Sequence, residues 1–314
     1  MPVEDAGPIL EVKNLSMHFT SRRRRRTTVV KAVDDVSFTI NKGETFGLVG
    51  ESGCGKTTLG RTIIRLYNPT SGTVKFGGRE ISGRMTRELR KYLTSNIAMI
   101  FQDPIASLNP RMTVQEIVGE GLIIRGLKDS AERESRVKLM LEKVGLQAEH
   151  AARYPHEFSG GQRQRIGIAR ALIVEPKMII ADEPVSALDV SVQAQVINLL
   201  NSLKREFGLT VLFIAHNLSV VKYFSDRIAV MYRGKFVEMA PSDDIYHHPL
   251  HPYTKALLSA VPQPDPHTER SRRRIYYEHT EPATGTLAMR EVVPGHYVYC
   301  TEEELQFYRR QLGA

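Results

Sequence analysis

The chain of 314 residues carries 43 Lys and Arg against 35 Asp and Glu, a formal net charge of +8, and 41% of its residues are hydrophobic. This balance is ordinary for a folded protein and excludes wholesale disorder, a collagen-like repeat and a coiled-coil rod. No apolar stretch approaches the ~20 residues of a membrane helix, and the first residues lack the pattern of a secretory signal. Two cysteines, Cys54 and Cys300, exclude a disulfide framework or a zinc cluster and favour a reducing cytosol.

The first third of the chain predicts strands with one helix between them. Residues 1–8 are expected to form a loose tail, and a strand is predicted over Leu10–Phe19, followed by an arginine-rich insertion. Alternation of Val36, Phe38 and Ile40 with polar residues indicates a half-buried strand. Apolar runs and helical spacing then predict strands over Thr45–Val49, Thr73–Phe76 and Ile97–Phe101 and a helix from about Lys56 to Tyr67.

The middle of the chain is predicted to be helical. From about Thr113 to Val144 the apolar residues recur at helical spacing, and Asp129 with Glu132 is a plausible helix start. This block reads as a helical insertion in an α/β domain. Strands and helices then alternate again, with strands expected over Met178–Ala181 and Val211–Ala215, a helix over Val192–Leu203, and a hairpin of Ile228–Tyr232 with Lys235–Glu238.

Alternation of strands and helices predicts an α/β fold with a mainly parallel sheet covered on both faces. After about Pro262 the sequence becomes rich in Pro, Arg and Tyr and is interpreted as an appended tail. Two basic clusters stand out, Arg22–Arg26 and a second one at Arg270, Arg272, Arg273 and Arg274. Each fits a solvated surface segment, and each also fits an electrostatic contact with lipid headgroups or nucleic acid.

A phosphate-binding loop is predicted directly after the strand Thr45–Val49. The motif G-x-x-x-x-G-K-[ST] is matched, and a helix follows it, which is the context that the motif requires. Glycines let the backbone wrap closely around phosphate oxygens, and the loop amides with the helix N-terminus supply a positive cradle. Lys56 would bridge the β- and γ-phosphates, and the Thr57 hydroxyl would ligate Mg²⁺. The predicted ATP-binding residues of this loop are Gly50, Glu51, Ser52, Gly53, Cys54, Gly55, Lys56, Thr57 and Thr58.

Cys54 lies inside this loop and has two interpretations. A thiol near a helix N-terminus can have a lowered pKa and be reactive. Alternatively, the cysteine is a small residue at a variable position, and this is the interpretation we prefer. Alkylation of Cys54 is in either case expected to block nucleotide binding sterically.

A second part of the phosphate site is predicted where the apolar strand Met178–Ala181 ends in two carboxylates. Ligands of α/β proteins bind at the carboxyl ends of parallel strands. Asp182 suits Mg²⁺, directly or through water, and Glu183 could polarise the attacking water as a general base.

The run Phe158-Ser159-Gly160-Gly161-Gln162 resembles the signature of the ATP-binding-cassette (ABC) ATPases, which usually reads Leu-Ser-Gly-Gly-Gln. A serine hydroxyl and glycine amides at a helix N-terminus form an anion site. The resemblance implies that Ser159, Gly160, Gly161 and Gln162 face the γ-phosphate held by an opposite subunit, so that ATP is enclosed between two copies.

The resemblance also implies a fold and a division into domains. The fold is the P-loop ABC ATPase domain, with a RecA-like, mainly parallel sheet, an antiparallel β part, an inserted helical subdomain and a C-terminal extension. Residues 1–8 would form the N-terminal tail, 9–265 the nucleotide-binding domain with its helical subdomain at about 103–165, and 266–314 the extension.

Further site residues are implied by position in the same family. Gln102 corresponds to the glutamine that reaches Mg²⁺ and senses the membrane partner, and Ser186, Ala187, Leu188 and Asp189 resemble the loop that communicates across the dimer. His216, at a strand end, corresponds to the histidine that contacts the γ-phosphate, although a lone histidine is often structural. Phe19 is the candidate for the aromatic ring that stacks on adenine, with a core position as the alternative.

Two further segments resemble the ATPases of oligopeptide and dipeptide importers, namely residues 101–111 and 248–262. Several members carry a cysteine-rich segment near the C-terminus that is thought to hold an iron–sulfur cluster. Only Cys300, after Gly295-His296, remains of it here, and a cluster normally needs four thiolates. No iron–sulfur cluster is therefore expected.

These resemblances imply the ATPase subunit of a membrane importer that binds ATP and Mg²⁺. Its expected partners are two membrane-spanning permease subunits, a second ABC ATPase subunit, identical or different, and an extracytoplasmic substrate-binding protein; nucleic acid is not expected. The expected location is peripheral, on the cytoplasmic face of the cell membrane. The alternative substrates to peptides are nickel, opines and oligosaccharides. Two alternative classes of protein remain open: a cytosolic ABC ATPase that acts on nucleic acid or ribosomes, and an unrelated phosphate-loop kinase.

Overall fold

The computed structural model describes residues 7–23, 26–261, 274–278 and 285–313. Most of the tail predicted at residues 1–8, the Arg22–Arg26 side chains, and Arg270, Arg272 and Arg273 of the second basic cluster lie outside this description. The chain divides into two compact units: residues 1–83 with 213–314, and residues 84–212.

The first unit contains an antiparallel sheet of four strands in the order β2-β1-β4-β5. Its strands are β1 (Leu10–Arg23), β2 (Arg26–Ile40), β4 (Ser71–Phe76) and β5 (Arg79–Glu80). An arginine-rich insertion after the first strand was predicted, and this is wrong. From His18 with Lys31 to Arg23 with Arg26, β1 and β2 pair without a register shift. The two strands of the hairpin therefore extend to Arg23 and Arg26.

The same unit contains a second sheet that begins with two parallel strands, β3 (Thr45–Val49) and β9 (Arg227–Tyr232). Antiparallel pairing then adds β10 (Lys235–Pro241), β12 (His296–Cys300) and β11 (Ala288–Val293) in that order. All five residues of β3 are buried, as an apolar run in a covered parallel sheet requires. Among the described residues, the helices of this unit are α1 (Lys56–Ile63), α7 (Leu218–Phe224), α8 (Ser242–His247), α9 (Pro252–Ser259) and α11 (Glu302–Gln311).

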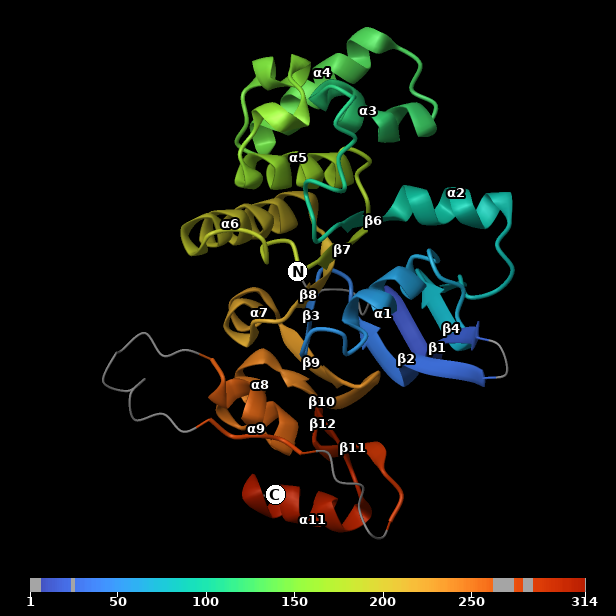
Figure 1. Cartoon of the computed structure of the whole chain (residues 1–314), viewed down its shortest axis with the longest axis vertical. Helices are drawn as coiled ribbons and strands as arrows, with labels where there is room; N and C mark the ends of the chain where they lie inside the picture. Colours follow the sequence, from blue (N-terminus) through green and yellow to red (C-terminus); the bar gives the residue numbers. More distant parts are fainter. Residues whose placement is uncertain (1–6, 24–25, 262–273, 279–284, 314) are drawn as a thin grey trace. The chain divides into compact units, whose positions relative to one another are not determined.

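The C-terminal segment was interpreted as an appended tail, and the structure corrects this. The strands β11 and β12 extend the sheet beyond β10, and α11 packs against them (Figure 1). Their apolar side chains form a separate small core with Leu250 of the preceding loop. Its other members are Val292, Val298, Cys300, Leu305 and Tyr308.

The predicted helix from Lys56 to Tyr67 is shorter in the structure and ends at Ile63. Arg65 adopts a left-handed backbone conformation (φ 63°), which terminates the helix. The Arg65 guanidinium then donates hydrogen bonds to the carbonyl oxygens of Ile81 and Gly83 and so holds the following turn.

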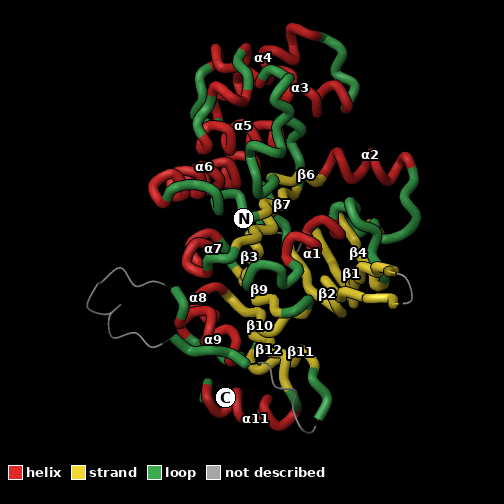
Figure 2. Tube along the Cα trace, viewed as in Figure 1, coloured by secondary structure: helices red, strands yellow, loops and turns green. Residues whose placement is uncertain are grey.

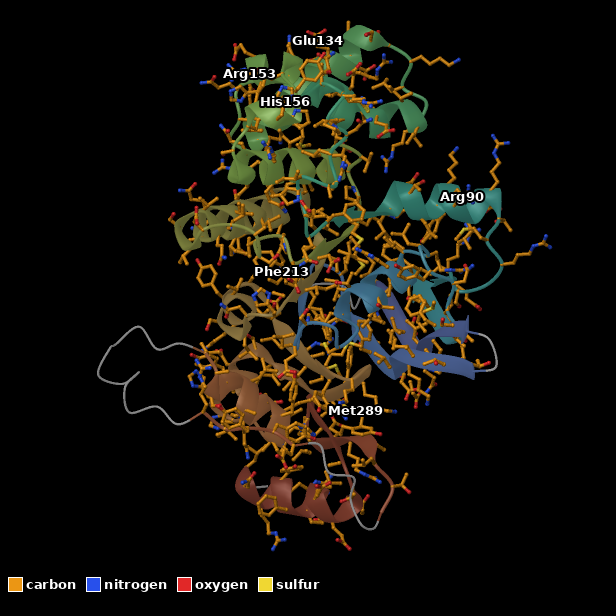
Figure 3. All side chains as sticks on the ribbon, viewed as in Figure 1. Arg90, Glu134, Arg153, His156, Phe213 and Met289 are labelled. Carbon is orange, nitrogen blue, oxygen red and sulfur yellow. The ribbon has the colours of Figure 1, made fainter. Side chains whose placement is uncertain are left out.

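The second unit is mainly helical, with two short parallel strands (Figure 2). These strands are β6 (Ile97–Ile100) and β7 (Met178–Asp182), and the pairing aligns Ile100 with Ala181. The helices are α2 (Arg87–Asn96), α3 (Val114–Ile124), α4 (Ser130–Lys143), α5 (Gly160–Leu172) and α6 (Val190–Phe207). Helix α2 was not predicted; it buries Leu89 and Leu93, while Arg90 projects outward (Figure 3).

Helices α3 and α4 form the helical block that the periodicity predicted, and both pack on α5, which lies beyond the predicted block. The side chain of Asp129 caps α4 by accepting hydrogen bonds from the amides of Ala131 and Glu132, as its position suggested. Strand β8 (Thr210–Ala215), which is buried along its whole length, contains the point at which the chain passes from the second unit back to the first.

Candidate functional site

The loop between β3 and α1 has a backbone that only glycine permits at two positions. A Cβ atom on Gly50 would lie 2.2 Å from the carbonyl oxygen of Met231, and one on Gly55 would lie 2.0 Å from that of Ala32. Gly55 also has φ 115°, a region that L side chains rarely adopt. The loop is therefore pressed against neighbouring backbone and keeps a fixed, tight shape.

Lys56 lies at the centre of this loop with only 3% of its surface exposed. Its ammonium donates hydrogen bonds to the carbonyl oxygens of Gly50 (2.7 Å) and Glu51 (2.9 Å). No side chain caps the start of α1, and its first turn holds no acidic residue. The loop thus presents a buried cation at a positive helix end, which is the electrostatic arrangement for binding phosphate.

Cys54 is 8% exposed and lies 3.8 Å from the Lys56 ammonium. Burial raises the pKa of the Cys54 thiol, and the opposing effect of Lys56 is smaller. The thiolate fraction at neutral pH is therefore low and the thiol reacts slowly, which supports the interpretation of Cys54 as a small residue in the loop.

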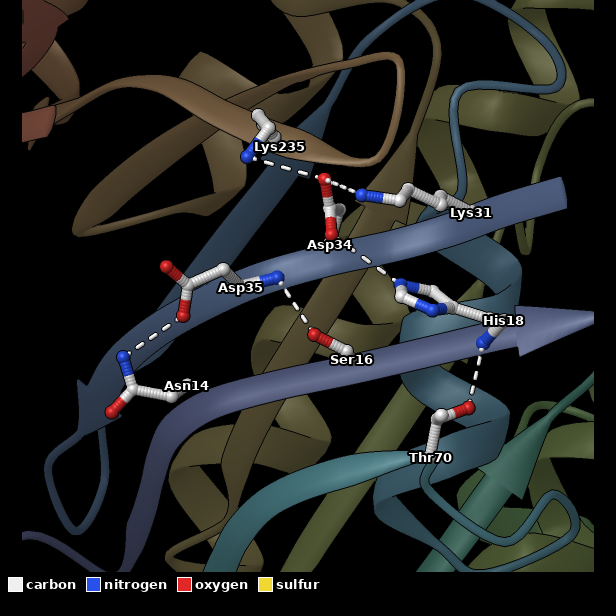
Figure 4. A network of polar contacts seen from close by, with 8 residues as sticks. All are labelled: Asn14, Ser16, His18, Lys31, Asp34, Asp35, Thr70 and Lys235. Atoms are coloured by element: carbon white, nitrogen blue, oxygen red, sulfur yellow. Dashed lines mark hydrogen bonds and ion pairs between the residues drawn. The ribbon is translucent and has the colours of Figure 1, made fainter. Parts of the chain in front are cut away.

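Phe19 lies on β1 and is 38% exposed, with its ring edge-on to Tyr67 at a centroid distance of 5.4 Å. It is therefore not a core residue. The preceding residue, His18, has Nε2 3.3 Å from Asp34 Oδ1, and Asp34 also pairs with Lys31 and Lys235 (Figure 4).

This network holds the β1–β2 hairpin against β10. Burial alone would raise the pKa of Asp34, but the two lysines outweigh it and the pKa lies below its usual value. The carboxylate thus stays ionised and keeps its cationic partners, which fixes the strand that carries Phe19.

His216 follows β8, on the side of the chain that belongs to the first unit. His216, Glu51 and Ser52 line one cavity of about 630 Å³. The structure therefore brings the predicted histidine and the phosphate loop to the same space.

In the second unit, Gln102 and Glu183 follow the ends of the parallel strands β6 and β7. Because Ile100 is aligned with Ala181, the residues two positions further on face each other, and Gln102 Nε2 donates a hydrogen bond to Glu183 Oε2 at 3.1 Å. Glu183 has φ 45°, so the backbone turns sharply at this carboxylate, and Asp182 before it is fully buried.

Ser159 caps the N-terminus of α5. Its hydroxyl accepts a hydrogen bond from the Gln162 amide at 3.4 Å, and the Gln162 side chain accepts one from the Ser159 amide at 3.0 Å. The four predicted signature residues line a cavity of about 780 Å³ together with Ala187, Leu188 and Asp189. Ser186 is not among the residues that line this cavity, and its hydroxyl donates a hydrogen bond to the Glu183 carbonyl oxygen at 3.1 Å.

The residues proposed for Mg²⁺ are distributed over both units: Thr57 lies in the first, Gln102 and Asp182 in the second. Hydroxyl, amide and carboxylate oxygens are the hard donors that Mg²⁺ prefers, so this donor set fits the ion. Both cysteines are free, and no group of three or more His, Cys, Asp or Glu side chains positioned for a metal occurs within the described residues.

Sequence reasoning missed one residue of the phosphate loop's surroundings. Tyr253, on α9, is 2% exposed, and its hydroxyl oxygen accepts a hydrogen bond from the Glu51 amide at 3.1 Å. The run His251-Pro252-Tyr253 could have pointed to this residue, but we interpreted it only as part of the segment that resembles importer ATPases.

Comparison with known structures supports the fold. The chain is similar to the dimeric ATP-binding cassette MJ0796 in a post-hydrolysis state bound to ADP and Pi, with 31% identity and a TM-score of 0.67 over 74% of this chain and 98% of that one. It is also similar to cbiO1 of Clostridium perfringens, part of the ABC transporter complex cbiONQ, with 27% identity and a TM-score of 0.66 over 77% of this chain and 91% of that one.

Comparison with curated sequences is more specific. The ABC transporter family matches residues 33–186, and the oligopeptide/dipeptide transporter C-terminal region matches residues 237–285. The chain is 60% identical over 304 residues to the oligopeptide transport ATP-binding protein OppF of Bacillus subtilis, covering 96% of this chain and 98% of that one. It is 54% identical over 306 residues to the dipeptide transport ATP-binding protein DppF of Lactococcus lactis, covering 96% and 97%.

The chain therefore belongs to the ABC transporter ATPases, within the family of oligopeptide and dipeptide transport ATP-binding proteins. This agrees with the predicted fold class and with the predicted ATPase activity. Across the described residues, no helix is both long and apolar enough to cross a membrane.

Proposed function

We propose that this chain is the ATP-hydrolysing subunit of an importer for oligopeptides or dipeptides. The observation that carries the proposal is the 60% identity to an oligopeptide transport ATP-binding protein across nearly the whole of both chains. It extends through the C-terminal region at residues 237–285, which the ABC domain alone does not contain.

In this function the first unit binds the phosphates of ATP. The Lys56 ammonium has three N–H donors, so it contacts the β- and γ-phosphates while it keeps its hydrogen bond to the Gly50 carbonyl oxygen. Phe19 stacks on the adenine, and His216 contacts the γ-phosphate. Thr57, Gln102 and Asp182 would hold Mg²⁺, which neutralises charge on the phosphate oxygens when it is bound.

Glu183 polarises the attacking water as the general base. Its hydrogen bond to the Gln102 amide, 3.1 Å long, orients the carboxylate and ties it to the residue proposed to sense the membrane subunits. A change in the position of Gln102 would therefore move the Glu183 carboxylate through this hydrogen bond.

The signature at the start of α5 acts on the ATP of a second subunit, so that two chains enclose two nucleotides. Ser159 to Gln162 and the loop Ala187–Asp189 line one cavity, which supports a joint role at the face between the two subunits. The remaining partners are two permease subunits and, through them, an extracytoplasmic binding protein, with this chain on the cytoplasmic face of the membrane.

The catalytic part of the proposal is tested with Glu183→Gln. Because a general base contributes about 10²- to 10⁴-fold, the variant should bind ATP normally and lose at least about 99% of ATPase turnover. The matched control is Glu142→Gln, an exposed residue of α4, which should keep wild-type turnover. Near-normal hydrolysis by Glu183→Gln would refute the assignment of the base.

The transport part is tested in native membranes. Tagged Glu183→Gln chain, trapped with Mg-ATP, should retain two polytopic membrane proteins that are identified by mass spectrometry. Uptake of labelled di- and oligopeptides should be lost on deletion of the chain and restored by the wild type but not by Glu183→Gln. Recovery of ribosomal or DNA-associated proteins instead would overturn the importer function.

A further inference from the structure

A hydrogen bond from the Glu51 amide to Tyr253 of helix α9 links the C-terminal part of the first unit to the phosphate loop. From α9, Tyr253 extends its ring into the protein, where it lies 4.4 Å from the ring of Tyr232 and 5.6 Å from that of Tyr277, measured between centroids. With 2% exposure the ring is fixed by packing, so the hydroxyl group has a defined position.

The hydroxyl oxygen of Tyr253 and the ammonium of Lys56 bind the same peptide group. The Glu51 amide donates to Tyr253 Oη at 3.1 Å, and the Gly50 carbonyl oxygen, at the other end of that peptide, accepts from Lys56 Nζ at 2.7 Å. Two side chains that are 197 positions apart in the chain therefore fix the orientation of the first peptide of the loop. Gly50 has no side chain that could fix this peptide, so the two hydrogen bonds add to the close packing of the loop against neighbouring backbone.

The start of α9 is itself anchored by a buried carboxylate. Glu238, which is fully buried on β10, accepts hydrogen bonds from the amides of Leu250 (2.8 Å) and His251 (3.0 Å). Its third partner is His296 Nε2 of β12, at 2.8 Å. His251 then caps the helix by accepting from the Tyr253 amide at 3.1 Å. The position of Tyr253 is thus set by the C-terminal strands.

We infer that Tyr253 is a positioning residue of the ATP site, through which the C-terminal part of the chain holds the phosphate loop in its binding conformation. The inference rests on the proposed ATPase function and deepens it. Tyr253 does not need to touch the nucleotide; its hydroxyl keeps the Gly50–Glu51 peptide turned so that the carbonyl oxygen faces Lys56. Burial raises the pKa of Tyr253, so the group is neutral at every physiological pH.

The test is Tyr253→Phe, which keeps the packed ring and removes only the hydroxyl group. We expect the affinity for Mg-ATP, measured by calorimetry on the full chain, to fall about three- to tenfold, as for the loss of one hydrogen bond. The KM for ATP should rise by the same factor with kcat changed less than twofold. The matched control is Tyr308→Phe, which removes another buried tyrosine hydroxyl in the small C-terminal core and should leave ATP affinity unchanged.

A second measurement needs no variant. Glu51, Ser52 and Gly53 are all exposed, yet within the described part of the chain only the Glu51 amide donates a hydrogen bond. Residue-resolved hydrogen exchange of the nucleotide-free protein should therefore show the Glu51 amide exchanging at least tenfold more slowly than its two neighbours. Equal exchange rates, or a Tyr253→Phe variant with wild-type ATP affinity, would overturn the inference. A wild-type chain without ATPase activity would instead overturn the proposed function, because the exchange contrast does not depend on hydrolysis.

Discussion

Two helices, α1 and α5, begin next to glycine residues and are each proposed to contact phosphate, but their N-termini are capped differently. At α1 no side chain caps the helix, and Lys56 is folded into the loop, where its ammonium binds the carbonyl oxygens of Gly50 and Glu51. At α5, Ser159 and Gln162 form a complete capping box. The first start holds a cation in readiness for phosphate, whereas the second is satisfied by its own side chains.

In the proposed function this difference suggests an order of events. We expect the loop before α1 to bind ATP within a single chain, because its buried cation and its tight shape are already present. The start of α5 has no buried residue of positive charge and is capped by its own side chains, so we expect it to contact a phosphate that a second chain has already bound. The proposal therefore predicts that ATP binds first and that two chains pair afterwards.

The largest expected effect is that of Lys56→Ala on the first helix start. The variant loses charge-assisted hydrogen bonds to phosphate, each worth about 1.5–3 kcal/mol, so we expect the affinity for Mg-ATP to fall about a hundredfold or more. Lys42→Ala, in the exposed turn before β3, is the matched control and should bind ATP as the wild type does. Calorimetry on the isolated chain measures the affinity for Mg-ATP. A loss of affinity below tenfold would contradict the proposed role of the first helix start in holding ATP.

Ser159→Ala tests the second helix start. Removal of the cap should lower the free energy of unfolding by about 1 kcal/mol, leave the ATP affinity of the isolated chain within twofold, and reduce turnover at saturating ATP at least tenfold. Thr113→Ala removes the same kind of capping box from α3 and should give the same loss of stability with normal turnover. Chemical denaturation and steady-state ATPase assays measure both quantities. If Ser159→Ala weakened ATP binding as much as Lys56→Ala does, the proposed division between the two helix starts would be wrong.

A smaller effect is expected for the thiol inside the first loop. Because burial raises the pKa of Cys54, the thiolate fraction is low at pH 7.5, and alkylation should be slower than that of glutathione and should accelerate as the pH rises. Burial raises the pKa of Cys300 to about 11, so this second thiol should remain unmodified up to about pH 9. Mass spectrometry of the Cys54→Ser and Cys300→Ser variants assigns the modified site. Mg-ATP should slow the reaction at Cys54 further, and alkylation faster than that of glutathione would contradict a closed loop.

Part of the site could be predicted because it depends on residues that are close in sequence. The loop around Lys56 and the helix start at Ser159 are each encoded within eight residues. The hydrogen bond between Gln102 and Glu183, which are 81 positions apart, was not predicted and follows from the register of two parallel strands. Features that depend on distant packing were missed. The contact between Tyr253 and the Glu51 amide joins residues 202 positions apart, and no local pattern encodes it.

The C-terminal segment was misjudged for a compositional reason. Its Pro, Arg and Tyr residues are typical of a solvated tail, whereas its core is made by a few apolar side chains such as Val292, Val298 and Leu305. These residues form a core only when β12 pairs with β10, which lies more than fifty positions earlier in the sequence. Conversely, the left-handed conformation of Arg65 shortened a helix whose apolar periodicity continued to Leu66.

The pairing of β12 with β10 has a consequence for solubility. A shortened chain that stopped after α9 would leave β10 with an uncovered strand edge, at the place where Glu238 and Met239 pair with Val298 and Tyr297. An unpaired edge next to newly exposed apolar side chains is a template for aggregation, and a buried glutamate without its histidine partner adds a cost of its own. We therefore expect a chain shortened after α9 to aggregate more readily than the full chain, independently of any role in transport.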